Sequence, residues 1–139
     1  MELVNNTAKI NEYKEKAKAI VKESDRLKTV DGFLNDIKKI ALQIEFTGEP
    51  LEIIIDKIKE TSALPKVWEC MQTGIASGSS VKKAWEDVKC PCLDRLGKEE
   101  KKTLDDFFCG LGMGNCESEK KNAGLVYGVL EDIRTRLAV

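Results

Sequence analysis

Apolar residues recur every three or four positions along most of this 139-residue chain. This spacing places them on one face of an α-helix, and it limits the fold more than any other feature of the sequence. No segment shows a convincing alternation of apolar and polar residues, which a half-buried strand would require. The sequence therefore predicts an all-α protein. The clearest stripe consists of Leu27, Val30, Leu34, Ile37, Ala41 and Ile44.

An earlier stripe lies near the N-terminus, with lysine and glutamate at most of the positions between its members. We expect residues 1–25 to form an amphipathic N-terminal helix or extension, ahead of a helical domain over residues 26–139. Because nothing between Asn5 and Thr29 firmly breaks the pattern, the two stripes can belong to one long helix. The sequence leaves open whether the first stripe packs inward, pairs with another copy of the chain or docks a partner. This stripe consists of Ile10, Tyr13, Ala17 and Ile20.

Glycine, proline and serine divide the rest of the chain into shorter helices, since glycine favours the end of a helix and proline its first turn. Residues 51–58 are rich in isoleucine, as a strand would be, but their spacing and the charged residues between favour a helix. A serine of the cluster Gly78-Ser79-Ser80 is a candidate N-cap for the helix that follows. Because the loops are short, we expect a compact bundle of about six to seven helices. The dividing segments are residues 48–50, 61–65, 78–80, 90–92 and 110–115.

The charges of the chain are nearly balanced, with 23 basic and 24 acidic residues and a net charge of −1. A chain of this length can bury about two-thirds of its unfolded surface, so a core can form without metals or disulfides. Lysines are dense in residues 14–22 and 98–102, but glutamates are interleaved with them, as on a solvated helix face. Such a balance gives no long-range attraction to nucleic acid, and we expect no nucleic-acid partner.

The chain contains no histidine. This excludes serine–histidine and cysteine–histidine nucleophiles, and it removes the commonest general base and a common metal ligand. No nucleotide-binding motif is present either. We therefore expect a protein that is not an enzyme, with no catalytic residues and no cofactor.

Two groups of residues resemble catalytic patterns only superficially. The pairs Glu99–Glu100 and Asp105–Asp106 would have to converge in one pocket to serve a hydrolase or transferase. Adjacent residues on a helix point in different directions, so we expect all four carboxylates to be solvated. The glycines of residues 110–114 follow a helix rather than a strand, and no lysine completes a phosphate-binding motif. We expect a turn between two helices there.

The chain has five cysteines, an odd number with no signal peptide before them, and we expect reduced thiols. The alternative is a cysteine–zinc-stabilised helical interaction module that uses Cys90, Cys92, Cys109 and Cys116. Known zinc modules usually have two to four residues between paired cysteines, whereas one and six residues separate these pairs. We therefore predict no metal site. The segment Cys90-Pro91-Cys92 also lacks the two-residue spacing of common redox motifs.

The two tryptophans are expected to anchor the core. Trp85 lies in the middle of a stripe between Val81 and Val88, with Ala84 beside it. An aromatic side chain in such a position buries a large area and fixes how short helices pack. The alternative, for Trp68 or Trp85, is a partner-binding hot spot.

Several short motifs occur in a fixed order between residues 27 and 137. Residues 43–51 have the form of a helix hairpin, and an Ala-Trp pair follows. Next come an acidic pair, a leucine, a phenylalanine and a Leu-Gly turn, before the cap of the last helix. In this order the motifs resemble the stage III sporulation protein AB family of endospore-forming bacteria, with Gln43, Phe46, Glu49 and Asn115 in place of its usual Glu, Tyr, Thr and Asp. The matching positions are Ile44, Phe46, Pro50, Leu51, Ala84, Trp85, Leu104, Phe107, Leu111, Gly112 and Asn115.

That family is similar to the cytoplasmic helical domains of the F component of type II secretion systems, so the resemblance implies an F-type helical bundle. It also implies a non-enzymatic scaffold or adaptor in the channel-like complex between mother cell and forespore. The implied partners are neighbouring subunits of that complex and its ATPase, on the mother-cell cytoplasmic side of the membrane that faces the forespore. The sequence leaves open whether the chain forms a homo-oligomer.

Members of the family carry a membrane span before and after this domain. No apolar run in the present sequence approaches the length of about 18 residues that a span requires. We expect the chain to be soluble as it stands, either as an excerpt or as a relative without anchors. Membrane attachment is implied only by the resemblance, through anchors that are absent from this chain.

Overall fold

The computed structural model describes residues 2–111 and 116–138, and side chains over these ranges except at residues 2–8, 19–22 and 116. All regular structure in these ranges is helical, so the predicted all-α fold is confirmed, and the helix count falls within the predicted six to seven. A 3₁₀ helix, η1 (Pro91–Arg95), accompanies six α-helices. These are α1 (Glu2–Phe46), α2 (Leu51–Thr61), α3 (Pro65–Ala76), α4 (Val81–Glu86), α5 (Lys98–Gly110) and α6 (Cys116–Leu137).

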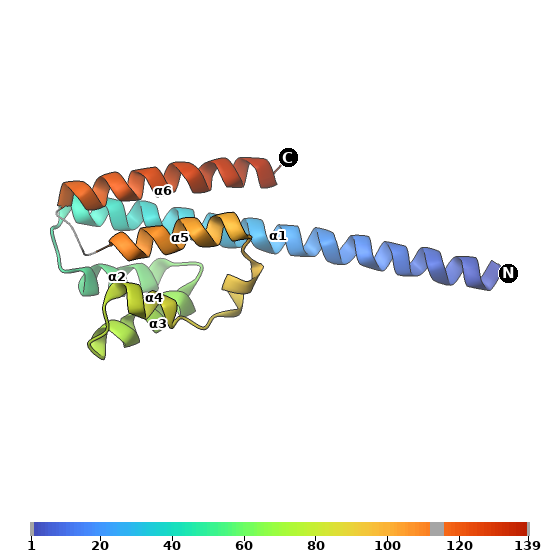
Figure 1. Cartoon of the computed structure of the whole chain (residues 1–139), viewed down its shortest axis with the longest axis horizontal. Coiled ribbons are helices and arrows are strands. Elements are labelled where there is room, and N and C mark those ends of the chain that lie inside the picture. Colours follow the sequence, from blue (N-terminus) through green and yellow to red (C-terminus); the bar gives the residue numbers. More distant parts are fainter. Residues whose placement is uncertain (1, 112–115, 139) are drawn as a thin grey trace.

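Helix α1 is the spine of the fold, and both N-terminal stripes belong to it. Its C-terminal half packs along α6, which runs in the opposite direction, and α5 packs against α6 (Figure 1). Helices α2, α3 and α4 form a second layer below these long helices in the view of Figure 1. The N-terminal half of α1 extends beyond both layers, so the N-terminus lies far from the bundle.

One core lies between the layers and takes buried side chains from every helix. Phe108 of α5 is central to it, because its ring stacks on Trp85 with 4.2 Å between centroids and contacts Trp68 at 5.8 Å. Trp85 also meets Phe33 of α1 edge to face. Trp68 and Trp85 are 0% and 6% exposed, so both are interior side chains in the folded chain.

The helix boundaries follow the glycine, proline and serine pattern of the sequence. Gly48 has a φ of +60° and ends the turn after α1, and Pro50 directly precedes α2. A positive φ is costly for residues other than glycine. The hydroxyl of Ser80 accepts a hydrogen bond from the backbone N–H of Lys83 at 3.1 Å and so caps α4. The isoleucine-rich residues 51–58 lie in α2, as their spacing predicted.

A buried carboxylate joins α1 to α3. Asp36 is 1% exposed, and its Oδ2 accepts hydrogen bonds from the indole N–H of Trp68 at 2.8 Å and the hydroxyl of Ser62 at 2.5 Å. Burial raises the pKa of Asp36 above its ordinary value, although the two hydrogen bonds and the charge of Lys39 act in the opposite direction. Helix periodicity alone did not predict this contact.

A second buried carboxylate fixes the point at which α1 leaves the bundle. The Arg26 guanidinium donates two hydrogen bonds to Glu100 at the start of α5, and Nη2 lies 3.0 Å from Oε2. Glu100 is fully buried, so the expectation that it would be solvated is wrong. Burial alone would raise the pKa of Glu100, but hydrogen bonds from Arg26 and nearby backbone groups outweigh burial and lower it. A Cβ at Gly97 would lie 2.5 Å from Arg26 Nη2, so glycine leaves room for the pair.

Replacing Arg26 with methionine should lower the free energy of unfolding by about 3 kcal/mol at neutral pH, because Glu100 then stays buried without its partner. Since the pKa of Glu100 is lowered in the folded state, its contribution is present above its unfolded-state pKa of 4.5. That contribution is lost as the pH falls through the folded-state pKa, so the two proteins should converge in acid. Urea denaturation across a pH series measures the difference.

Arg134→Met is the matched control, because Arg134 pairs with Asp31 at the surface, with side chains 51% and 39% exposed. Exposed ion pairs contribute at most about 1 kcal/mol. Equal losses for Arg26→Met and Arg134→Met at neutral pH would show that the burial of Glu100 does not determine the effect.

Replacing Asp36 with asparagine should make stability less dependent on pH, because the oxygen acceptor remains while the ionisable group is removed. With a raised folded-state pKa, the favourable contribution of Asp36 is fully present below its unfolded-state pKa of 3.8 and is lost as pH rises through the folded-state pKa. As the pH rises through this range, the melting temperature of the Asp36→Asn protein should therefore increase relative to that of the parent. Asp36→Leu is the control, because it leaves the Trp68 indole without an acceptor and should cost about 1–3 kcal/mol at every pH. Parallel curves for parent and Asp36→Asn would contradict the prediction.

Candidate interaction surface

The part of α1 that precedes Arg26 projects away from the bundle (Figure 1). Residues 2–25 extend for about 36 Å at the usual rise of ~1.5 Å per residue. The side chains at residues 9–18 and 23–24 are all exposed, and Ile10 and Tyr13 are 52% and 69% exposed. Of the three alternatives for the first stripe, inward packing is therefore wrong for Ile10, Tyr13 and Ala17. Ile20 lies outside the described side chains.

This projecting segment is helical for two physical reasons. The costly nucleation step is already made in the packed half of α1, and each further residue only propagates the helix. Local ion pairs then add support, with 3.8 Å between Lys16 and Glu12 and between Lys18 and Glu15. Pairs of this spacing each contribute a few tenths of a kcal/mol. The result is one continuous helix that is fixed at its base.

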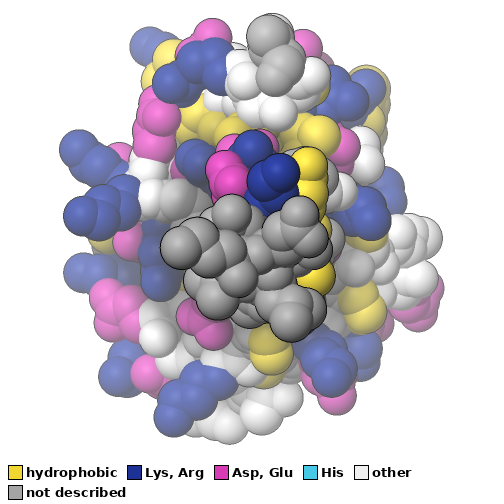
Figure 2. Space-filling view, turned by 90° about the vertical axis from the view of Figure 1, so that its right-hand side faces the viewer, with side chains coloured by type: hydrophobic (Ala, Val, Ile, Leu, Met, Phe, Trp, Pro, Cys, Tyr) yellow, Lys and Arg dark blue, Asp and Glu magenta, His cyan; other side chains and the backbone are white. Residues whose placement is uncertain are grey.

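Ion pairs surround that base. Arg26 pairs with Glu100, and Arg136 of α6 holds Glu99 of α5 at 2.8 Å. Arg134 of α6 also pairs with α1. Figure 2 views the molecule from this end and shows lysine and arginine side chains interleaved with acidic ones around the rim. Three ion pairs therefore tie α1, α5 and α6 together near the point where α1 leaves the bundle.

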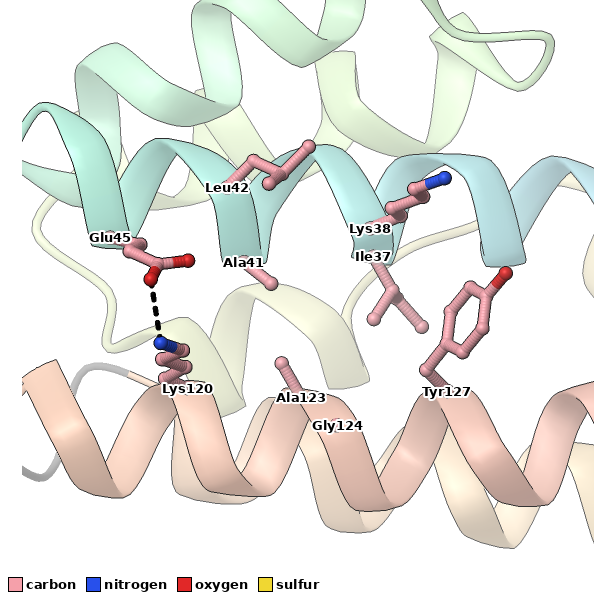
Figure 3. A pocket seen from close by; sticks show the side chains of 9 residues that line it. All are labelled: Ile37, Lys38, Ala41, Leu42, Glu45, Lys120, Ala123, Gly124 and Tyr127. Carbon is pink, nitrogen blue, oxygen red and sulfur yellow. Dashed lines mark hydrogen bonds and ion pairs between the residues drawn. The ribbon is translucent and has the colours of Figure 1, made fainter.

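A groove of about 390 Å³ runs between α1 and α6 on the opposite half of the bundle. Figure 3 shows Ala41 of α1 facing Ala123 of α6, with Gly124 beside it, and such small residues let the two helices approach closely. Lys120 closes one end through an ion pair with Glu45 at 2.7 Å. The groove lining is mainly apolar, and it lies along the packed interface between α1 and α6. Its lining residues are Ile37, Lys38, Ala41, Leu42, Glu45, Lys120, Ala123, Gly124 and Tyr127.

Large apolar side chains also reach solvent near this groove. Phe46 at the end of α1 is 76% exposed, and Leu125 of α6 is 65% exposed. Val129 follows Leu125 one turn later on the same outer face and is 42% exposed. The neighbouring Gly128 has open space where a Cβ would stand. Helical spacing alone does not distinguish these outward residues from the core stripe.

Most of the positions that carry the family resemblance lie inside the protein. Leu51 is half-buried, Pro50 is exposed beside the first turn of α2, and Phe46 projects into solvent. Gly112 and Asn115 lie outside the described residues. The remaining positions are core side chains, so these motifs mainly describe how the bundle packs. The buried positions are Ile44, Ala84, Trp85, Leu104, Phe107 and Leu111.

The four carboxylates at the start and middle of α5 do not share a pocket. Glu99 and Glu100 pair with different arginines, on α6 and α1 respectively. Asp105 accepts a hydrogen bond from the Trp85 indole at 2.7 Å, and Asp106 is exposed. The arrangement holds helices together, and the convergence that a carboxylate-based hydrolase would require is not formed.

The described cysteines are distributed over three regions. Cys90 and Cys92 flank the start of η1, whereas Cys109 is exposed near the far end of α5 and Cys70 is half-buried in α3. The side chain of Cys116 lies outside the described residues. Among the side chains that are described, no three Cys, Asp or Glu residues are placed to hold a metal ion together. The zinc alternative therefore has no support from these residues.

None of the helices, over the part of the chain that the structure describes, is both long and apolar enough to cross a membrane.

The bundle has a known counterpart among solved structures. It is similar to a structure of stage III sporulation protein AB, with a TM-score of 0.73 and 21% sequence identity. The match covers 84% of this chain and 95% of the other. At this identity the likeness establishes a shared fold. No family model matches the chain, and no match is found among the curated proteins.

Proposed function

We propose that this chain is a non-enzymatic scaffold or adaptor domain of the stage III sporulation complex, on the premise that it shares the fold of stage III sporulation protein AB. Because one fold can serve many functions, the surface has to support the proposal as well. The observation that carries it is the projecting half of α1, where a helix fixed at its base presents Ile10 and Tyr13 to solvent.

An exposed apolar stripe on a rigid helix suits protein recognition. Burial of a large apolar side chain contributes about 1.5–3 kcal/mol, which the projecting segment does not gain within its own chain. A partner helix or groove can supply that burial. Since the helix is already formed, little ordering entropy is lost on binding. The ion pairs around Arg26 keep the bundle in a fixed orientation while the helix engages.

The partners in this proposal are neighbouring subunits of the channel-like complex and its ATPase, on the mother-cell cytoplasmic side of the membrane that faces the forespore. The projecting helix of residues 2–25 would engage a neighbouring subunit, and a second copy of the chain is one such neighbour. The bundle of residues 26–139 would then serve as the adaptor domain proper, as in the F-type domains of secretion systems that it resembles.

The test is binding of the full chain to each purified soluble subunit of the complex and to the ATPase, by titration calorimetry. Replacing both Ile10 and Tyr13 with glutamate should weaken binding at least ten-fold, equivalent to about 1.4 kcal/mol. Both side chains are exposed in the free chain, so stability should change by less than about 0.5 kcal/mol. Light scattering on both proteins shows whether the neighbour is another copy.

The matched control replaces Asn11 with glutamate and Lys18 with glutamine, which makes the same charge change on the other side of the same helix. It should bind as the parent does. If the control and the Ile10/Tyr13 variant lose equal affinity, the stripe is not the binding surface. If no component of the complex binds the parent chain, the assignment to that complex is wrong.

A further inference from the structure

The segment Cys90-Pro91-Cys92 brings two thiols together in the link between α4 and α5. The Cys90 backbone is extended, with φ −133° and ψ 131°, and Pro91 begins the 3₁₀ helix η1. The chain turns at Pro91, and the two Sγ atoms come to lie 3.0 Å apart. This is only about 1 Å longer than a disulfide bond of ~2.0 Å. Both cysteines are free thiols in the structure.

The backbone can accept a bond between these sulfurs. Two residues of fully extended chain span at most about 7 Å, and a turn shortens that distance. Disulfides usually join residues whose Cα atoms are about 4.4–6.8 Å apart. A Cys90–Cys92 bond therefore needs no movement of one helix against another. The closed ring would be small, with half-buried Cys90 on its accessible side, and disulfides that are strained or exposed are easily reduced again.

The two thiols differ in access. Cys90 is half-buried, whereas Cys92 is buried, with 8% of its surface exposed. Burial, together with the hydrogen bond and charge of Cys90, raises the pKa of Cys92 to about 12. An attack from solvent will therefore involve Cys90 first. Cys92 lies directly behind it and can complete the exchange.

Both cysteines line a cavity of about 300 Å³. Lys66 and Arg95 contribute the positive charge of its lining, and Leu64 and Pro65 contribute apolar surface. This combination suits a small disulfide whose carboxylates meet the two cations while its sulfur approaches Cys90.

We propose that Cys90 and Cys92 form a reversible dithiol–disulfide site for a low-molecular-weight disulfide that carries carboxylates. The Cys90 thiolate attacks one sulfur of that disulfide, and the bond between the two small-molecule sulfurs breaks. The first small thiolate leaves and takes up the proton that Cys90 lost. Cys92 then gives its proton to solvent and attacks Cys90 Sγ, which forms the intramolecular bond and breaks the mixed disulfide; the second small thiolate leaves and takes up a proton from solvent. In total, two cysteines are oxidised and one small disulfide is reduced to two thiols.

The site lies next to the base of the projecting helix. Helix η1 packs against α1, and Cys92 belongs to the same core cluster as Leu104 and Phe108. Bond formation draws Cys92 towards Cys90 and so changes the link that leads into α5. The inference is independent of the proposed partners, because the chemistry involves only this chain.

The experiment treats the reduced full chain with oxidised glutathione, blocks remaining thiols by alkylation and maps modified peptides by mass spectrometry. The parent should lose two hydrogen atoms within the peptide of residues 90–92, and Cys90 should carry no glutathione at the end of the reaction. Cys92→Ser and Cys92→Ala should instead retain glutathione on Cys90. Circular dichroism checks that each variant is folded, and the two replacements guard against loss of the fold in either one.

Cys109 is the internal reference, because it is exposed and should form only a mixed disulfide. Stable glutathione on Cys90 of the parent, or no reaction at Cys90 under conditions that modify Cys109, would overturn the proposal. Replacing Lys66 and Arg95 with glutamine should slow the reaction with glutathione disulfide about three-fold or more, by loss of charge attraction. The same variant should react with neutral hydroxyethyl disulfide at the parental rate. Equal slowing with both reagents would show that the cavity does not bind carboxylates.

Discussion

The aromatic contacts of Phe108 hold the two layers of this protein together. Its ring stacks on Trp85 of α4 and touches Trp68 of α3, while Trp85 reaches Phe33 of α1. Aromatic pairs in these geometries add about 0.5–1.5 kcal/mol each beyond the apolar area that they bury. Helix α4 has only six residues and could not hold a position by itself. The contacts of Trp85 with Phe33 and Phe108 fix the position of α4, and this also fixes where the link to α5 begins.

Two buried carboxylates then fix the register of α1 against this core. Asp36 receives the Trp68 indole, and Glu100 receives the Arg26 guanidinium. Apolar packing alone is non-directional, whereas each of these contacts requires a particular atom in a particular place. Since α1 is one continuous helix, the rotation set at Arg26 also sets the direction in which Ile10 and Tyr13 point. The polar contacts inside the bundle therefore orient the surface outside it.

The sequence predicted the helices well because their apolar spacing and their glycine, proline and serine boundaries are local signals. Ser80 is an example, since its cap depends on residues three positions apart. Local spacing could not predict that Glu100 is buried, because its partner Arg26 lies far away along the chain. A buried indole N–H usually requires a hydrogen-bond acceptor, so a partner for Trp68 could be expected from the sequence. The sequence did not indicate that this partner is Asp36. Exposure of Leu125 and Val129 likewise depends on how α6 is rotated, which spacing leaves undetermined.

The residues that carry the family resemblance and the residues that can meet a partner are largely different sets. Trp85, Leu104 and Phe107 are interior, so their order in the sequence reflects the packing of a bundle, and a fold likeness at 21% identity agrees with that. Ile10 and Tyr13 contribute nothing to that core. Substitutions there should therefore have little effect on folding. Two proteins can therefore keep this bundle while differing on the exposed face of the first helix, because the residues that pack the core do not constrain those that face solvent.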